Sequence, residues 1–284
     1  MHTSVTADTP ALTSLGPGLA ALGPAESELL TTVDAVVTRL AAQTAAVSLI
    51  GPPLLPADML ARLDYFANFP HLGVVAARFT EPAMELLADE RDLAELTAEH
   101  HAPTGFLLPS ATCYGLLFQL REQELGGPAL LTSVGRCFRN EREYSGLRRL
   151  WGFHMREILY VGDREGAQSH LDEWRARIEE TAAVMGLTLT VEPANDPFYR
   201  KESSRARLSA LDPVKHEFLA PDGTAIASVN RHRNFFGERL GISLSGQAAY
   251  SSCVAFGLER WVHALVLAHG SAAAALRWAR DALG

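Results

Sequence analysis

The sequence is poor in cysteine and in long apolar runs. Its three cysteines, Cys113, Cys137 and Cys253, form no CxxC pair, which argues against a disulfide framework and indicates a reducing compartment. The longest apolar run near the C-terminus, around residues 262–268, is too short to span a bilayer. The N-terminus has no basic region followed by an apolar stretch, so no signal peptide is evident. We therefore expect a cytoplasmic protein with no membrane partner.

Positive charge is also scarce. Acidic residues outnumber basic ones by 33 to 25, which gives a formal net charge of −8. A general nucleic-acid binder needs the opposite field, because neutralisation of phosphates drives that affinity. The 284 residues are 48% hydrophobic and 20% charged, which excludes a disordered or low-complexity chain. They suffice for one large domain or two small ones.

Several familiar catalytic motifs are missing. The sequence has no GxxxxGKS/T, HExxH or GxSxG pattern, which argues against P-loop enzymes, zincins and α/β-hydrolases. A loose GxGxxA match at residues 16–21 follows no strand, so we interpret it as part of the N-terminal segment. Residues 1–24 are aperiodic and rich in Gly, Pro, Ser and Thr, and we expect them to be flexible.

Helices and strands alternate irregularly along the remaining chain. The best-defined helix spans about 163–186, because Asp163 is a good N-cap and Gly186 ends it. Strand-like segments at 130–141 and 152–161 are close enough to be antiparallel neighbours. Together these features predict an α+β fold with an antiparallel sheet. The other predicted elements are a helix from Glu26, strands at 46–50 and 187–191, a short helix within 60–69, a helix or loop at 81–96, a hairpin over 218–229, and helices at about 254–268 and 271–283.

The segment from Phe138 to Phe153 carries a pattern suited to a nucleotide. Arg139 and Glu141 lie two residues apart, so on a strand both side chains would point to the same face. The arginine can fork onto a phosphate, while the carboxylate can accept hydrogen bonds from an amine. Arg149 could reach a polyphosphate tail, and Phe153 could stack on a flat base. The alternative is a surface salt bridge between Arg139 and Glu141 beside a core phenylalanine.

A second segment, AFGLER at residues 255–260, places an arginine where an apolar helix begins. The N-terminal end of a helix is electropositive, so Arg260 in the first turns suits an anion. The alternative is a solvent-exposed helix arginine.

Together the two segments resemble motifs 2 and 3 of class II aminoacyl-tRNA synthetases, in both order and separation. Ala255 replaces the first glycine of motif 3, and Gly51-Pro52-Pro53 resembles part of motif 1, the dimerisation element. The resemblance covers roughly residues 26–268. It implies the catalytic fold of that class, a six- or seven-stranded antiparallel sheet flanked by helices that holds a bent ATP. Residues 25–284 would then form the catalytic domain, in a homodimer.

Three residues far apart in the sequence suggest a metal site. Taken alone, Cys113 and Cys253 are most simply buried small hydrophobes. With Glu157, however, they resemble the Cys/Glu/Cys zinc site of atypical seryl-tRNA synthetases and of their truncated relatives, the amino acid–carrier protein ligases. The resemblance implies a Zn²⁺ whose open fourth position receives the α-amino group of the substrate. Cys137 has no such role, and we expect it in the core.

The resemblance favours a carrier protein ligase over a synthetase. Nothing before Glu26 could form the tRNA-binding domain of a seryl-tRNA synthetase, and the net charge is of the wrong sign. Segments at 64–71, 195–198 and 228–232 are also similar to stretches of the ligases. We therefore interpret the chain as an AMP-forming ligase and expect no tRNA partner.

The resemblance implies two reaction steps. An amino acid and ATP form an aminoacyl-adenylate, and the phosphopantetheine thiol of a carrier protein then takes the aminoacyl group. Arg139 would stabilise the α-phosphate, Arg260 would hold the γ-phosphate and Phe153 would stack on adenine. Glu141 would orient the nucleotide or the amine, and Glu217 is the candidate ligand of Mg²⁺, although it could equally be a surface residue. The family precedent favours glycine or alanine.

The docking surface and two other functions stay open. The stretch 199–207 carries four basic residues against one acid, which suits an acidic carrier protein or simply a solvated loop. The helix at 163–185 is a rival docking surface. One alternative function is a catalytically silent paralogue that binds an amino acid or adenylate and regulates a partner. The other is a tRNA-aminoacylating enzyme that relies on a partner subunit.

Overall fold

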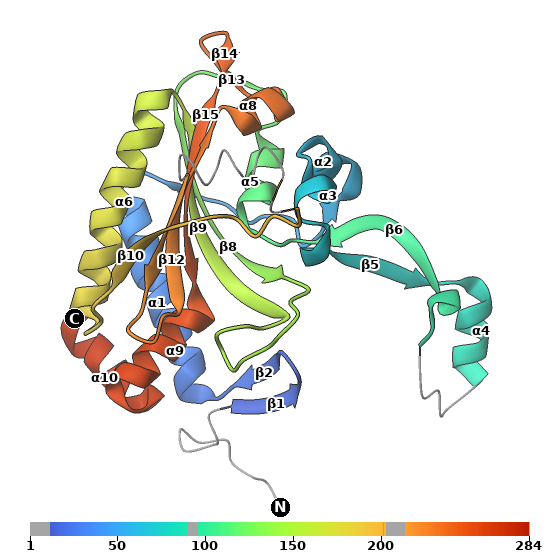
Figure 1. The fold of residues 1–284 in the computed structure, drawn as a ribbon, viewed down its shortest axis with the longest axis horizontal. Coiled ribbons are helices and arrows are strands. Elements are labelled where there is room, and N and C mark those ends of the chain that lie inside the picture. Colours follow the sequence, from blue (N-terminus) through green and yellow to red (C-terminus); the bar gives the residue numbers. More distant parts are fainter. Residues whose placement is uncertain (1–11, 90–95, 201, 203–213, 284) are drawn as a thin grey trace, which may run out of the picture.

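A central sheet of seven strands organises the chain (Figure 1). The computed structural model describes residues 12–89, 96–200, 202 and 214–283. Neighbouring strands run antiparallel except β3 and β8 at one edge, which are parallel. The strands in spatial order are β10 (Thr190–Ala194), β11 (Lys215–Leu219), β12 (Ala225–Arg233), β15 (Tyr250–Gly257), β9 (Gly152–Gly162), β8 (Ala129–Phe138) and β3 (Val47–Ser48). The predicted α+β fold is confirmed.

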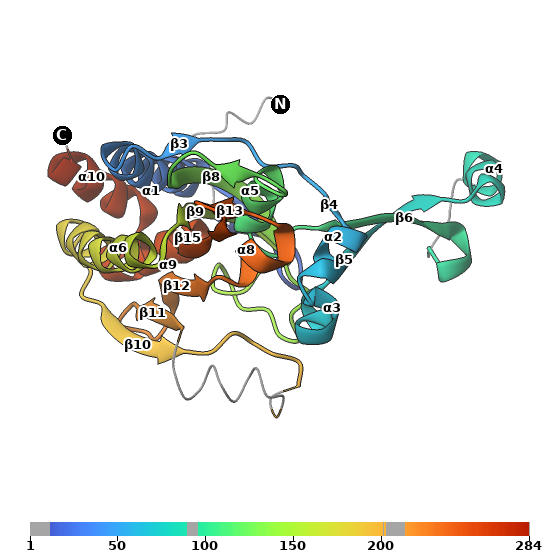
Figure 2. The ribbon, with the colours of Figure 1, turned by 90° about the horizontal axis from the view of Figure 1, so that it is seen from above.

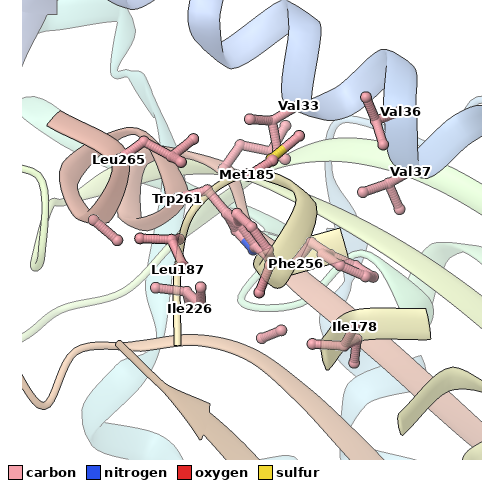
Figure 3. Packing of buried hydrophobic residues seen from close by; sticks show 14 of the residues in the cluster. Val33, Val36, Val37, Ile178, Met185, Leu187, Ile226, Phe256, Trp261 and Leu265 are labelled. Carbon is pink, nitrogen blue, oxygen red and sulfur yellow. The ribbon is translucent and has the colours of Figure 1, made fainter. Parts of the chain in front are cut away.

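Three helices cover one face of the sheet (Figure 2), α1 (Pro24–Gln43), α6 (Arg164–Val184) and α9 (Leu258–His269). A fourth helix, α10 (Ala272–Leu283), packs on α1 and α9. Asp163 caps α6 as predicted, because its side chain accepts a hydrogen bond of 2.8 Å from the backbone N–H of Gly166. The apolar stripes of these helices and the facing strand residues form the larger core (Figure 3), in which Trp174 and Trp261 are fully buried.

Shorter helices pack on the opposite face and form a second core. They are α2 (Ala57–Arg62), α3 (Tyr65–Asn68), α5 (Cys113–Gln119) and α8 (Phe235–Leu240). Strand residues alternate between the two cores: on β15, Val254 and Phe256 belong to the core with α1, whereas Cys253 belongs to the core with α5. The sheet therefore separates two apolar layers.

A ribbon of two long strands extends from the body (Figure 1). Strands β5 (Val74–Phe79) and β6 (His101–Leu108) pair along it, and α4 (Glu81–Asp89) lies at its far end. At its base β6 also pairs with β4 (Leu55–Pro56). Smaller elements are the 3₁₀ helices η1 (Pro70–Leu72) and η2 (Ala98–His100) and a small sheet of β7 (Glu124–Leu125), β13 (Ser243–Leu244) and β14 (Gln247–Ala248).

Most predicted elements form where the sequence places them. Strands β8 and β9 pair without interruption from Ala129–Val161 to Phe138–Gly152, and β11 and β12 form the predicted hairpin. The C-terminal helix begins at Leu258 instead of about 254, because residues 250–257 are strand β15. The predicted strand at 187–191 is shifted to 190–194.

The N-terminal segment also differs from the expectation of an aperiodic lead-in. Residues 12–22 form an antiparallel hairpin of β1 (Leu12–Gly16) and β2 (Leu19–Leu22). The turn is possible because Gly18 adopts a positive φ of +73°, a conformation that glycine tolerates without strain. Residues 1–11 lie outside the described part of the chain.

The membrane question and the two candidate docking surfaces can be addressed for the described residues. No helix among the described residues combines the length and the apolar character needed to cross a membrane. Of the basic stretch 199–207, residues 201 and 203–207 lie outside the described residues. The rival docking surface, α6, is fully described.

Candidate active site

The six nucleotide candidates line one pocket. The pocket lies on the sheet face turned away from α1, because Ala255 and Gly257 line it while Val254 and Phe256 lie in the core with α1. The structure thus brings together residues from β9, β11, α9 and the loop at 139–151 between β8 and β9, here called the nucleotide loop. The six residues are Arg139, Glu141, Arg149, Phe153, Glu217 and Arg260.

Arg139 lies at the start of the nucleotide loop. Strand β8 ends at Phe138, so Arg139 and Glu141 share the pocket through the loop conformation and not, as the sequence suggests, through alternation on a strand. The guanidinium of Arg139 donates from Nε to the carbonyl of Ser110 at 3.1 Å and lies 5.2 Å from the centroid of the Phe153 ring. These contacts orient its remaining donors and the aromatic ring in the same part of the pocket.

Arg260 projects from the first turn of α9. Its Nε donates to the carbonyl of Arg148 at 2.9 Å and its Nη1 to the carbonyl of Ala225 at 3.1 Å. Burial and the neighbouring Arg139 guanidinium lower the pKa of Arg260 from its usual range. A guanidinium has five N–H donors, so the two backbone contacts fix its position and leave donors for an anion.

Carboxylates offset only part of the positive charge of the pocket, whose lining has five basic and three acidic side chains. Glu141 lies 4.0 Å from Arg149, and Glu217 pairs with Nζ of Lys215 at 2.8 Å. The same ammonium lies 3.7 Å from Asp196. Lys215 was not among the residues predicted from the sequence. Its position two residues before Glu217 on a strand is the signal that could have identified it.

Cys113, Glu157 and Cys253 converge on the same sheet face. Their ligand atoms all lie within 4.8 Å of one another, and all three residues are buried. Cys253 and Glu157 come from the adjacent strands β15 and β9, and Cys113 begins α5. The Sγ of Cys253 donates to Oε2 of Glu157 at 3.0 Å. Backbone N–H groups also donate to this carboxylate, from Cys113 at 2.9 Å and from Thr112 at 3.1 Å.

The donor set of this cluster fits zinc. A hydrogen bond with Cys253 lowers the pKa of the Cys113 thiol. Burial and the Glu157 carboxylate act in the opposite direction and together outweigh it, so the pKa is raised to about 11. Burial likewise raises the pKa of Cys253. Two sulfurs and a carboxylate are ligands that zinc takes, and three protein ligands leave one tetrahedral position open. Cys137 lies in the core as predicted, with its Sγ 3.5 Å from Oγ1 of Thr112.

No family model matches the chain. It is 31% identical over 246 residues to amino acid–acyl-carrier-protein ligase 2 of Bradyrhizobium diazoefficiens, covering 82% of this chain and 73% of that protein. It is 30% identical over 271 residues to ligase 1 of the same organism, covering 88% and 82% respectively. The chain belongs to the amino acid–acyl-carrier-protein ligase family. It is therefore a ligase.

A solved structure shows the fold shared by this ligase family and class II synthetases. Seryl-tRNA synthetase of M. kandleri, in complex with tRNASec of A. aeolicus, superposes with a TM-score of 0.78 at 20% identity. The match covers 91% of this chain but only 55% of the synthetase chain, so the ligase spans about half of its length. The predicted class II catalytic fold is confirmed.

Proposed function

We propose that the chain activates an amino acid with ATP and transfers the aminoacyl group to a carrier protein. The observation that carries the proposal is the position of the nucleotide pocket beside the Cys113/Glu157/Cys253 cluster. Met155 and Ala255 line the pocket and lie two residues from Glu157 and Cys253 on the same strands. Two residues on one strand face are about 7 Å apart. An amino acid bound at the cluster would therefore lie next to the α-phosphate of ATP.

The first step is attack of the substrate carboxylate on the α-phosphorus. A carboxylate oxygen forms the new P–O bond, and the bond to the β-phosphate breaks, so pyrophosphate leaves with the electron pair. Arg139 would stabilise charge on the α-phosphate and Arg260 would hold the γ-phosphate. Phe153 would stack on adenine, and Arg149 would meet the polyphosphate tail.

Two carboxylates complete the nucleotide site. Glu141 would orient the nucleotide or the amine, since it lies in the pocket with Arg149 at 4.0 Å. Glu217 is the proposed ligand of a phosphate-bound Mg²⁺. Its ion-pair partner Lys215 also lies near Asp196, so Lys215 would interact with both carboxylates.

Zinc held by Cys113, Glu157 and Cys253 would bind the amino group of the substrate and so fix its orientation before reaction. We propose a small substrate, glycine or alanine. Tyr114 follows Cys113, and burial and then the neighbouring Cys113 raise its pKa well above the usual range. Its ring packs edge-on against that of Tyr65, with centroids 6.0 Å apart. We propose that these two rings limit the space for a larger substrate side chain.

In the second step a phosphopantetheine thiol takes the aminoacyl group. The sulfur attacks the carbonyl carbon of the adenylate, the thiol loses its proton, and AMP leaves. The carrier protein would dock at the basic stretch 199–207, since carrier proteins are usually acidic, or on the rival surface of α6.

The test is amino-acid-dependent ATP–pyrophosphate exchange over the twenty standard amino acids, with zinc measured on the same sample. We expect exchange with glycine or alanine and about one zinc per chain. Cys253→Ser should lose both, whereas Cys137→Ser, which changes the buried cysteine outside the cluster, should keep both. Absence of exchange despite bound zinc would favour the silent paralogue. Transfer to tRNA instead of a carrier protein would favour the synthetase alternative.

We also propose that two copies of the chain pair along the edge of β8. Strand β3 pairs only with residues 131 and 132 of β8, so within the described residues no strand borders 133–137 on that side, and at its end the backbone N–H of Phe138 donates to the carbonyl of Pro109 at 2.7 Å. Val47, Ile50 and Val134 are exposed beside this edge, with Ile50 94% accessible. An open strand edge rimmed by apolar side chains is a template for pairing with another chain.

A further inference from the structure

The N-terminal hairpin lies against the nucleotide loop. The backbone N–H of Trp151, the last residue of the loop, donates to the carbonyl of Gly18 at 2.9 Å. The ring of Tyr144 stacks on that of Trp151, with centroids 5.3 Å apart and an interplanar angle of 27°. The turn of the hairpin therefore contacts the loop through a backbone hydrogen bond, next to an aromatic pair that lies within the loop.

The absence of a side chain on Gly18 makes this contact possible. Tyr144 lies so close that a Cβ added to Gly18 would be 2.4 Å from Cδ1 of its ring. Any larger residue at 18 would push the ring away. Gly18 also has a positive φ of +73°, so two independent features require glycine there.

The loop transmits this contact to the nucleotide candidates. The backbone N–H of Arg139 donates to the carbonyl of Trp151 at 3.1 Å and so closes the base of the loop. Farther along, the carbonyl of Arg148 accepts the 2.9 Å hydrogen bond from Arg260, and Leu147 and Leu150 are buried in the core with α1. A shift at Trp151 would therefore move Arg139 directly.

We infer that the β1–β2 hairpin is a positioning element for ATP, with Gly18 and Tyr144 as its positioning residues. It holds the nucleotide loop in its binding conformation before ATP arrives, so binding does not have to order the loop. The inference rests on the proposed function for its ligand. The structural part of the inference, that the hairpin orders the nucleotide loop, does not depend on the proposed function.

The test compares Gly18→Ala with Gly246→Ala in the full chain. Gly246 has the same φ of +73°, but a Cβ there would meet nothing within 4 Å, so it controls for backbone strain alone. The first readout is cleavage by trypsin after Arg142, Arg148 and Arg149 of the loop, located by mass spectrometry. We expect cleavage several-fold faster in Gly18→Ala and unchanged in Gly246→Ala.

The second readout is the KM for ATP in pyrophosphate exchange. It should rise about tenfold in Gly18→Ala, since re-ordering even one backbone residue costs about that factor. The KM for the amino acid and the zinc content should not change. Tyr144→Ala should reproduce both effects if Gly18→Ala folds poorly, and Tyr144→Phe, which keeps the ring, should show neither.

The outcomes separate the two proposals. Equal cleavage rates in Gly18→Ala, Tyr144→Ala and the unmodified chain would overturn the inference, as would equal effects in Gly246→Ala. So would faster cleavage with no change in the KM for ATP. If the unmodified chain shows no exchange with any amino acid, the proposed function fails, and the assignment to ATP falls with it. The cleavage rates still decide whether the hairpin orders the loop.

Discussion

At the residue scale, a buried ion pair ties the first helix to the sheet. Arg156 on β9 donates from Nε and Nη2 to the two carboxylate oxygens of Asp34 on α1, at 2.6 and 2.9 Å, and is only 5% exposed. Asp34→Ala would leave a buried guanidinium without its carboxylate. We expect this variant to lose about 3–5 kcal/mol of unfolding free energy, measured by urea denaturation.

Glu28→Ala on the same helix is the matched control. Glu28 pairs with Arg280, and both side chains are largely exposed. Its loss should cost about 0–1 kcal/mol. Equal costs for the two variants would show that burial does not distinguish the pairs.

His170 makes stability depend on pH. Its Nδ1 lies 2.9 Å from Oγ of Ser252, and it packs between the rings of Tyr160 and Trp174. Burial and then the nearby His232 lower its pKa to about 3. His170 therefore binds a proton near pH 6.5 in the unfolded chain but stays neutral at that pH in the folded chain. The contribution of neutral His170 to the unfolding free energy is fully present above that pH. It is lost as the pH drops toward 3, by about 1.4 kcal/mol per pH unit.

His170→Asn should reduce this slope. Urea midpoints between pH 7.5 and 5 provide the measurement, and the variant should decline less than the unmodified chain. His232, whose pKa burial lowers to about 4, should keep part of the slope in the variant. Identical slopes in the two proteins would contradict the assignment to His170.

Local sequence patterns identified some of the candidate site residues and not others. The five residues of motifs 2 and 3 could be chosen because each motif is local in the chain, and all five line one pocket. The cluster of Cys113, Glu157 and Cys253 depends on the register of β9 with β15 and on the position of α5, which local patterns do not encode. Only the family resemblance suggested it. Lys215 was missed because its one signal, the two-residue spacing from Glu217 on a strand, belongs to no motif.

At the scale of elements, periodicity predicted the amphipathic helices well and the buried strands poorly. Helix α6 has a cap and a regular apolar stripe. Strand β15 is covered by helices on both faces and therefore lacks polar alternation, so part of it was read as the start of α9. The hairpin of β1 and β2 was missed because its strands are short and contact the nucleotide loop, which is remote in sequence.

Helix α9 offers a direct test of its buried stripe. Leu265 is 1% exposed within the larger core, whereas Leu267, two residues later, is 59% exposed. Leu265→Ala should lower the unfolding free energy by about 2–5 kcal/mol, because it removes buried methyl groups and leaves a cavity. Leu267→Ala should change it by less than about 0.5 kcal/mol. Urea denaturation of both variants measures the difference, and similar losses would mean that α9 is not packed as described.

At the scale of the whole molecule, the sheet divides structural and chemical roles. The face with α1, α6, α9 and α10 carries the larger core, and the opposite face carries the nucleotide pocket and the Cys/Glu/Cys cluster. The cluster joins β9, β15 and α5, and the pocket joins β9, β11, β12, β15, α9 and the nucleotide loop. Because β9 and β15 contribute to both, the proposed amino acid and ATP sites lie next to each other on the same two strands.

The edge of β8 supplies the prediction for the whole molecule. If two copies pair there, light scattering after size-exclusion chromatography should give twice the chain mass of 30.8 kDa. The double variant Ile50→Glu, Val134→Glu should be monomeric, because pairing would bury the two new carboxylates in the interface without partners. Leu267→Glu adds a charge at an exposed leucine away from this edge and should leave the dimer intact. A monomeric unmodified chain at tens of micromolar, or a dimer unaffected by the double substitution, would remove β8 as the interface.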